Sequence, residues 1–181
     1  MDALLVIDMQ KDFMAGGALP VPGANLLLQP INTMLCCFAK KRAPIFLSRC
    51  WHPANHISFK SWPPHCVQDT AGAEFADGLL VPEDAAVVSK GVAVDQEGYS
   101  AFENTDLLAS LREKHIQRLF LGGVAMEYCV YHTAKDALRH AFEVILLTDC
   151  IAGLNAQAIQ EKETELKNQG IQCTESRLVP C

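Results

Sequence analysis

Reactive side chains follow four separate apolar segments of this sequence. The segments are residues 3–7, 43–47, 85–88 and 119–121, and the side chains after them are Asp8, the group Cys50, His52 and His56, then Lys90, then Cys129. If the segments are parallel strands, these groups gather at the carboxyl edge of one sheet, where open α/β sheets bind ligands. A carboxylate, an ammonium, a thiol and imidazoles in one cleft indicate an enzyme.

Cys129 is a candidate nucleophile because it lies between a strand and the first turn of a helix. Free amide N–H groups and the positive end of the helix dipole lower the pKa of a thiol there and can hold an oxyanion. The alternative is a buried structural cysteine, the common fate of a free thiol. With Asp8 and Lys90 expected at the same edge, the nucleophile is the better interpretation.

Asp8 and Lys90 have roles that would support such a nucleophile. A carboxylate next to a thiol can act as general base and return the proton to a leaving group. A lysine between them would keep the carboxylate ionised and favour the thiolate. The alternatives are a loop-capping aspartate, which we favour for the nearby Asp12, and a solvated lysine.

A metal site is predicted within residues 50–66, which hold Cys50, His52, His56 and His65. Imidazole and thiolate suit zinc or another first-row transition metal. The spacing fits no zinc-finger pattern, so a catalytic site with open positions is expected. Aromatic side chains flank these groups and would either close the core or sandwich a flat ring: Phe13, Trp51 and Trp62.

Apolar runs alternate with helical patterns, which predicts an α/β fold with a mostly parallel sheet. Strands are expected at residues 3–7, 44–48, 85–89, 116–121, 143–148 and 171–175. Helices are expected at residues 24–41, 107–114, 126–141 and 156–168. Residues 50–84 read as one long loop, and loops of that length are usually functional. No linker divides the chain, so residues 1–181 are expected to form a single domain.

Composition restricts the partners and the compartment. The net charge of −6 and the lack of a basic run argue against nucleic acid or an anionic membrane as a partner. No segment is apolar enough to span a membrane and no signal peptide is recognisable, so a cytoplasmic protein is expected. Most cysteines should then be free thiols. Cys36, Cys37 and Cys150 are expected to fill the core, whereas Cys173 and Cys181 have no arguable role.

The motifs around these residues resemble the isochorismatase-like cysteine hydrolase family, and within it the nicotinamidases. The resemblance covers nearly the whole chain. It rests on residues 6–13 with 16–23, residues 51–59 with 62–68 and 72–75, Lys90-Gly91 with residues 99–102, and residues 123–125 with 128–130. The segment from Trp51 to Gln68 resembles the metal segment of nicotinamidases, which other branches of the family generally lack.

The resemblance implies a three-layer α/β/α fold with a six-stranded sheet and a triad of Asp8, Lys90 and Cys129. It also implies a cis peptide between Val124 and Ala125 and an oxyanion hole formed by the amides of Ala125 and Cys129. The implied divalent metal ion, expected to be zinc, falls on Cys50, His52, His56 and His65. The implied substrate walls are Phe13, Trp62, Val124, Ala125 and Tyr128.

The implied activity is hydrolysis of nicotinamide to nicotinate and ammonia through a cysteine thioester, as used in NAD salvage, with pyrazinamide as a second substrate. Self-association into a homo-oligomer is compatible with this fold. One departure matters: Cys50 stands where the family normally has an aspartate ligand, and a thiolate can still bind zinc. Two alternatives therefore stay open, another amide or ureido hydrolase of the family, and a catalytically impaired member that binds a pyridine or a metal.

Overall fold

The computed structural model describes all 181 residues and contains one six-stranded sheet with every strand parallel. The strand order is β3-β2-β1-β4-β5-β6. The strands are β1 (Asp2–Ile7), β2 (Ile45–Cys50), β3 (Ala86–Lys90), β4 (Arg118–Gly123), β5 (Glu143–Ile151) and β6 (Gln172–Thr174). The apolar segments of the sequence thus form the predicted parallel sheet.

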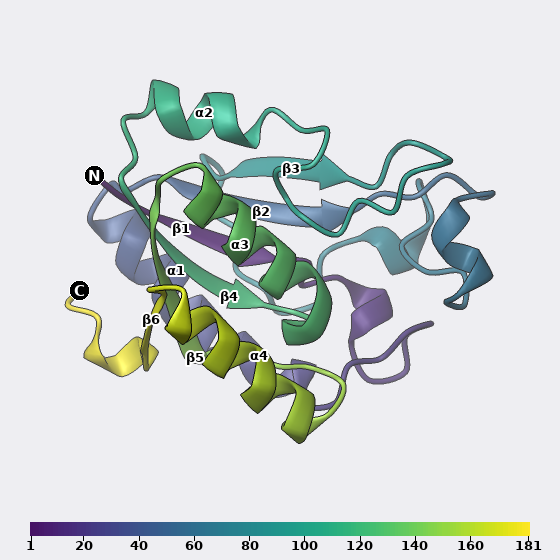
Figure 1. The fold of residues 1–181 in the computed structure, drawn as a ribbon. Helices are drawn as coiled ribbons and strands as arrows, with labels where there is room; N and C mark the ends of the chain where they lie inside the picture. Colours follow the sequence, from purple (N-terminus) through teal and green to yellow (C-terminus); the bar gives the residue numbers. More distant parts are fainter.

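Helices cover both faces of this sheet and complete the predicted three-layer α/β/α fold (Figure 1). They are α1 (Leu28–Lys40), α2 (Leu107–Glu113), α3 (Tyr131–Arg139) and α4 (Ala156–Asn168). In Figure 1, α3 and α4 lie in front of the sheet and α1 lies behind it. The arrows of β1 to β4 point toward the same side in Figure 1, where the long loops gather. The candidate residues lie at this carboxyl edge.

Two of the predicted helices begin with a turn of another type, so their α-helical part starts later than the sequence pattern indicates. Residues 24–27 form a 3₁₀ turn before α1, and Pro30 falls in the first turn of α1, where a missing N–H breaks no helical hydrogen bond. The predicted helix at residues 126–141 starts as a single π turn, Met126–Val130, and continues as α3. The π turn is the segment that carries Cys129, and such turns are frequent at functional sites.

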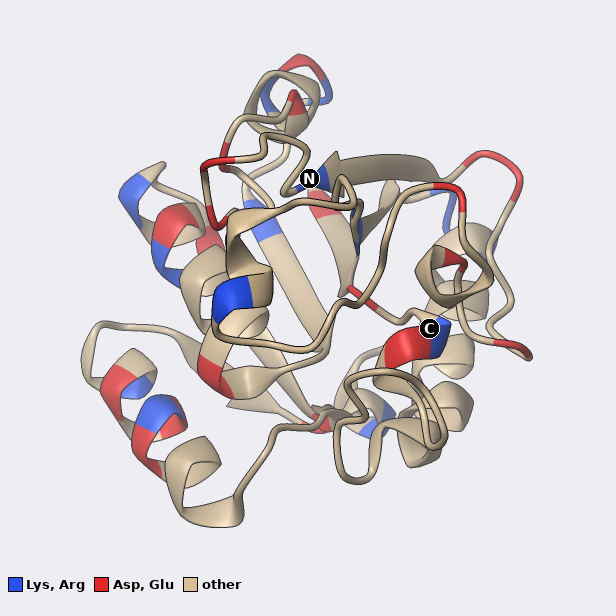
Figure 2. Ribbon diagram, turned by 90° about the vertical axis from the view of Figure 1, so that its right-hand side faces the viewer, with Lys and Arg blue, Asp and Glu red and all other residues tan.

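The core lies on both faces of the central strands. Residues Ala3 to Ile7 of β1 are all at most 1% exposed, because β1 has a strand on each side and a helix layer on each face. Acidic and basic residues are interspersed along the helices (Figure 2), in keeping with the modest net charge. None of the helices has the length and apolar composition that crossing a bilayer requires.

Three cysteines differ from the expectation of buried and free thiols: Cys36, Cys37 and Cys181. Cys37 is buried as predicted but forms a disulfide with Cys181, 144 residues away. The prediction that Cys36 fills the core is wrong: Cys36 is exposed, because neighbouring helix positions face different sides. Cys150 is fully buried in β5, as predicted. Six of the cysteines are free thiols.

Gly123 ends β4 where a side chain has no room. Its φ of +124° is one that L-residues rarely adopt, and a Cβ there would overlap the carbonyl oxygen of Ile7. We expect Gly123→Ala to lower the free energy of unfolding by more than about 3 kcal/mol, because β1 and β4 must separate. Denaturant unfolding measures this loss.

Gly78→Ala is the matched control, since Gly78 also has a positive φ of +85° but no atom within 4 Å of the place that a methyl group would take. Only backbone strain, about 1 kcal/mol, should be lost there. Equal losses in the two variants would contradict the steric argument for Gly123.

Candidate active site

The strand ends place three of the predicted residues together. Asp8 follows β1 directly, with a φ of 52° that turns the chain sharply at the sheet edge. Cys50 and Lys90 are the last residues of β2 and β3 and are paired in register. Since β2 lies between β3 and β1, this register brings the long Lys90 side chain toward Asp8.

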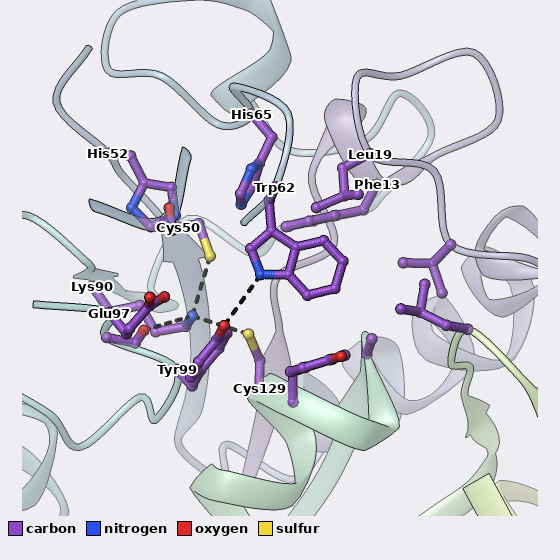
Figure 3. Close-up of a pocket in the computed structure, with 16 residues that line it drawn as sticks. Phe13, Leu19, Cys50, His52, Trp62, His65, Lys90, Glu97, Tyr99 and Cys129 are labelled. Atoms are coloured by element: carbon purple, nitrogen blue, oxygen red, sulfur yellow. Dashed lines mark hydrogen bonds between the residues drawn. The ribbon is translucent and has the colours of Figure 1, made fainter. Parts of the chain in front are cut away.

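Lys90 is the centre of a buried polar cluster. Its Nζ lies 2.9 Å from Asp8 Oδ2 and 3.3 Å from Cys129 Sγ. It also donates to Cys50 Sγ at 3.1 Å and to the Gly98 carbonyl at 3.2 Å. Figure 3 shows the two sulfur atoms on either side of the lysine nitrogen. The predicted triad residues Asp8, Lys90 and Cys129 are therefore brought into contact, with Cys50 as a fourth member.

Charges within this cluster govern its protonation. Burial alone would lower the pKa of Lys90, but the neighbouring Asp8, Cys129 and Cys50 outweigh it and raise that pKa well above its usual value. The pKa of Cys129 is also raised, first by its contact with Cys50 and then by burial, although Lys90 opposes the shift. Cys129 therefore rests as a thiol and needs a base, and Asp8 is the carboxylate at hand.

The turn that carries Cys129 is held from two sides. The N–H of Val124 donates to the carbonyl of Ile7, which fixes the end of β4 to β1. Glu127 Oε1 accepts from the backbone N–H groups of Leu154 and Asn155 at 2.8 and 3.0 Å. The expected cis peptide between Val124 and Ala125 is present. The Ala125 N–H has no acceptor within the chain, as an oxyanion donor requires.

Two buried residues that sequence reasoning assigned no role position the cluster. The Ser48 hydroxyl donates to Asp8 Oδ1 at 2.6 Å. The Gln10 amide donates to the carbonyls of Cys50 and Ala73, both at 2.8 Å, and its oxygen accepts from the Cys50 N–H at 2.7 Å. A polar residue inside an apolar strand is the only sequence signal for Ser48. Gln10 has none, because its partners depend on how the loops fold.

Ser48→Ala should weaken both stability and catalysis. The variant leaves Asp8 Oδ1 buried without its hydrogen bond, which costs about 1.5–3 kcal/mol in unfolding free energy, and it frees the carboxylate to rotate. We expect a lower kcat at nearly unchanged KM. Ser89→Ala is the control, because the Ser89 hydroxyl meets only Arg49 at the outer strand. Equal effects of both substitutions would exclude a positioning role for Ser48.

A pocket opens above this cluster. Its walls include the predicted residues Phe13, Trp62, Ala125 and Tyr128, together with Leu19, Val21, Tyr99 and Leu154, which the sequence did not single out. Trp62 Nε1 donates to the Tyr99 hydroxyl at 3.2 Å, and Trp62 packs edge-on against Tyr128. Val124 is 1% exposed and lies outside the lining, so its predicted substrate contact gains no support here.

The three predicted metal histidines are buried and adjacent. The ring centroids of His52 and His56 are 4.1 Å apart, and those of His52 and His65 are 5.1 Å apart. The Nδ1 atoms of His52 and His65 face the carbonyls of Gly91 and Pro63, at 2.9 and 2.8 Å. Carbonyl partners of this kind fix the ring so that Nε2 can bind a metal.

These residues fit a divalent ion by the chemistry of their donors, with one rearrangement. Both ring nitrogens of His56 already have partners, the Ser58 hydroxyl at 2.6 Å and the Gln96 carbonyl at 2.8 Å. His56 must give up one of them to become a ligand. The Cys50 thiol contacts Asp8 and Lys90, and its sulfur groups with Asp8 and Cys129 instead of with the imidazoles. Metal ligation by Cys50 and His56 stays a prediction.

Burial lowers the pKa of His65 to about 4, so this imidazole is neutral at neutral pH. In the unfolded chain the pKa is near 6.5, so unfolding takes up a proton at pH values between the two. We expect the metal-free protein to lose unfolding free energy, on the order of 3 kcal/mol, as the pH falls from about 6.5 to about 4. His65→Gln should flatten this dependence in denaturant titrations at several pH values. If the unfolding free energy of His65→Gln depends on pH as steeply as that of the unmodified protein, His65 is not the group responsible.

The fold and the site fit a hydrolase: a thiol on a strand-to-helix turn lies against a buried lysine that also contacts an aspartate. A model of the isochorismatase domain matches residues 2–177. The chain belongs to the isochorismatase family.

Several similar proteins of this family are nicotinamidases or pyrazinamidases. The nicotinamidase of Escherichia coli (strain K12) is 36% identical over 180 residues, covering 86% of this chain and 84% of that protein. The pyrazinamidase of Pyrococcus horikoshii in complex with zinc has a TM-score of 0.93 at 47% identity and covers 96% of this chain and 98% of its own. PnC1 from L. infantum in complex with nicotinate has a TM-score of 0.91 at 38% identity, and the match covers 98% of this chain and 93% of that chain. A divalent metal ion and a small-molecule substrate are supported by these similarities.

Proposed function

We propose that residues 1–181 form one hydrolase domain that converts nicotinamide to nicotinate and ammonia with the help of a divalent ion, expected to be zinc. The contact of Lys90 with both Asp8 and Cys129 beneath an aromatic pocket is the observation that carries this proposal. The similarity to nicotinamidases and to a nicotinate-bound relative supports the choice of substrate. The product nicotinate would enter NAD salvage.

In the proposed reaction Asp8 accepts the thiol proton of Cys129, and the sulfur attacks the carboxamide carbon. The positive charge of Lys90 beside both groups stabilises the negative charge as it moves from the Asp8 carboxylate to the Cys129 sulfur. The amides of Ala125 and Cys129 stabilise the tetrahedral oxyanion. Asp8 then returns the proton to the leaving nitrogen, ammonia departs, and a water molecule deprotonated by Asp8 hydrolyses the thioester.

The pocket walls orient the ring so that its carboxamide reaches Cys129. Phe13 lies against His65, with ring centroids 5.6 Å apart, and the hydrogen-bonded pair of Trp62 and Tyr99 forms another part of the wall. His52 and His65, joined by His56, would hold the divalent ion, while the Cys50 thiol, predicted as a further ligand, contacts Asp8 and Lys90. When bound, the ion supplies a Lewis-acid contact for the ring nitrogen, which selects pyridine and pyrazine carboxamides over aliphatic amides.

Ammonia release from nicotinamide by the purified protein tests this proposal, on a sample whose bound metal has been quantified by elemental analysis. We expect turnover of nicotinamide and pyrazinamide with about one metal ion per chain. Cleavage of aliphatic amides by metal-free protein that ignores nicotinamide would assign the chain to another amide-hydrolysing branch of the family. Nicotinamide binding without ammonia release would show that the protein is a catalytically impaired member of the family that binds a pyridine.

A further inference from the structure

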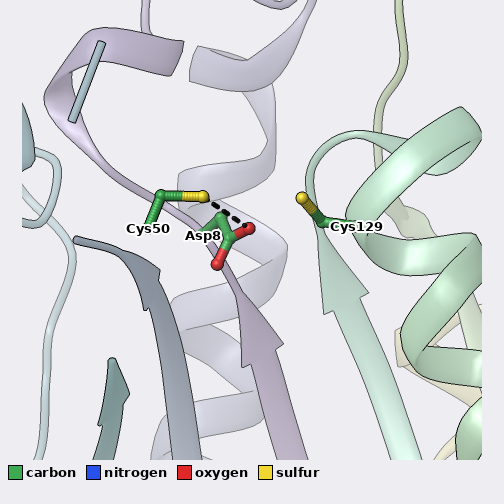
Figure 4. A group of neighbouring side chains, drawn as sticks. All are labelled: Asp8, Cys50 and Cys129. Atoms are coloured by element: carbon green, nitrogen blue, oxygen red, sulfur yellow. Dashed lines mark hydrogen bonds between the residues drawn. The ribbon is translucent and has the colours of Figure 1, made fainter. Parts of the chain in front are cut away.

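A second thiol lies beside the candidate nucleophile. The sulfur atoms of Cys50 and Cys129 both accept hydrogen bonds from the same Lys90 nitrogen, at 3.1 and 3.3 Å. Together with a carboxylate oxygen of Asp8 they lie within 4.8 Å of one another (Figure 4). We propose that Cys50 and Cys129 form an oxidation site, at which peroxide produces an intramolecular disulfide that silences the nucleophile until a thiol reductant restores it.

The neighbours of the two thiols suit this chemistry. Lys90 lies against both sulfur atoms, so its ammonium stabilises negative charge on whichever one is reacting. The Cys50 thiol donates to Asp8 Oδ2 at 3.5 Å, so the carboxylate can take its proton. Lys90 contacts no other thiol of the chain, which sets this pair apart from the remaining free cysteines.

Both thiols are also within reach of a small oxidant. Cys50 and Cys129 are only 4% and 7% exposed, yet both line the pocket that opens to solvent. They come from different strands, at the end of β2 and beyond β4, and Asp8 at the end of β1 lies between those strands in the sheet. Bond formation to the ~2.05 Å of a disulfide therefore draws the two sulfur atoms together over Asp8, into the space the substrate carboxamide needs.

The oxidation proceeds in two balanced steps. The Cys129 sulfur attacks one oxygen of hydrogen peroxide, the O–O bond breaks, and the departing hydroxide takes the thiol proton to give water and a sulfenic acid. The Cys50 sulfur gives its proton to Asp8 and attacks the Cys129 sulfur, the S–O bond breaks, and the leaving hydroxide takes that proton from Asp8 to give a second water. Two thiols are oxidised to one disulfide, and one peroxide is reduced to two waters.

The disulfide would protect the nucleophile as well as switch it off. A sulfenic acid without a neighbouring thiol proceeds to sulfinic and sulfonic acids, which ordinary thiol reductants do not reverse. Cys50 lies close enough to intercept the sulfenic acid first. A serine at position 50 would keep the size of the side chain but lose this interception.

Peptide mass mapping under non-reducing conditions tests the proposal. The sample is the protein whose bound metal has been measured by elemental analysis, after treatment with hydrogen peroxide. We expect a cross-linked peptide pair joining Cys50 to Cys129, two hydrogen atoms lighter than the separate peptides, and its loss after dithiothreitol. In Cys50→Ser, Cys129 should instead appear as sulfinic or sulfonic acid. Cys150→Ser, which alters a buried thiol away from the pocket, should form the cross-link like the unmodified chain.

A parallel measurement of nicotinamide turnover rests on the proposed function, whereas the peptide mass mapping does not. Each variant is compared with its own activity before peroxide: dithiothreitol should restore most activity to the unmodified chain and little to Cys50→Ser. A cross-link without any nicotinamide turnover would leave the oxidation site standing and reject the nicotinamidase. Sulfinic acid at Cys129 in the unmodified chain, with no Cys50–Cys129 peptide, would overturn the oxidation site.

Discussion

Cys129→Ala is expected to lower ammonia release from nicotinamide by more than about 10³-fold while leaving the fold intact. Alanine removes only the sulfur that must bond to the carboxamide carbon, and the pocket walls and Lys90 stay in place. Nicotinamide should still bind, because the ring contacts do not involve the sulfur. The measurements are turnover, ligand binding by calorimetry, and the thermal unfolding midpoint.

Cys150→Ala serves as the control for the loss of a buried thiol, since Cys150 is fully buried in β5 but does not line the pocket. It should keep nearly full turnover. If Cys129→Ala stays within tenfold of the unmodified enzyme, Cys129 is not the nucleophile, and Cys50, the other thiol lining the pocket, becomes the first alternative to examine.

Asp8→Asn should damage both catalysis and stability. The variant removes the proton acceptor, so turnover should fall by about 10³-fold or more. It also leaves the Lys90 ammonium buried without its carboxylate partner, 2.9 Å away in the intact protein. Breaking a buried ion pair from one side costs about 3–5 kcal/mol of unfolding free energy. Denaturant unfolding and steady-state kinetics measure the two losses separately.

The double variant Asp8→Asn with Lys90→Met separates these effects. Methionine is close to lysine in length and removes the stranded charge, so most of the lost stability should return while turnover stays abolished. A double variant as unstable as Asp8→Asn alone would show that the two side chains do not act as a pair. Normal turnover by Asp8→Asn would remove Asp8 from the proposed reaction.

Much of the fold could be predicted because each catalytic candidate terminates an apolar run. Alternating runs and helical patterns are enough to predict a parallel sheet, and a parallel sheet collects Asp8, Lys90 and Cys129 at one edge. The family resemblance adds the triad pattern and the cis peptide, which spacing alone does not indicate. Strand ends shifted by about two residues, as for β4, which continues through Gly122 and Gly123.

The remaining features depend on distances that a sequence does not contain. The register of β2 against β3 decides that Cys50 lies beside Lys90, and a shift of one residue would turn Cys50 to the other face. Ser48 and Gln10 reach Asp8 and Cys50 only after β1 and β2 pair. The bond between Cys37 and Cys181 joins residues 144 positions apart, and no spacing rule indicates that pairing.

The strand order also places the groups proposed for bond cleavage and part of the groups proposed for substrate recognition on different sides of β1. The nucleophile and its backbone donors extend from β4, on one side of β1, whereas Trp62 and the three buried imidazoles belong to the long loop between β2 and β3, on the other side. We therefore expect mutations of the side chains of this loop that line the pocket, such as Trp62, to change substrate choice more than bond cleavage. For protein engineers, exchanging the pocket-facing side chains of this loop, while keeping the backbone that holds Gln10 through the Ala73 carbonyl, is a route to new amide specificities.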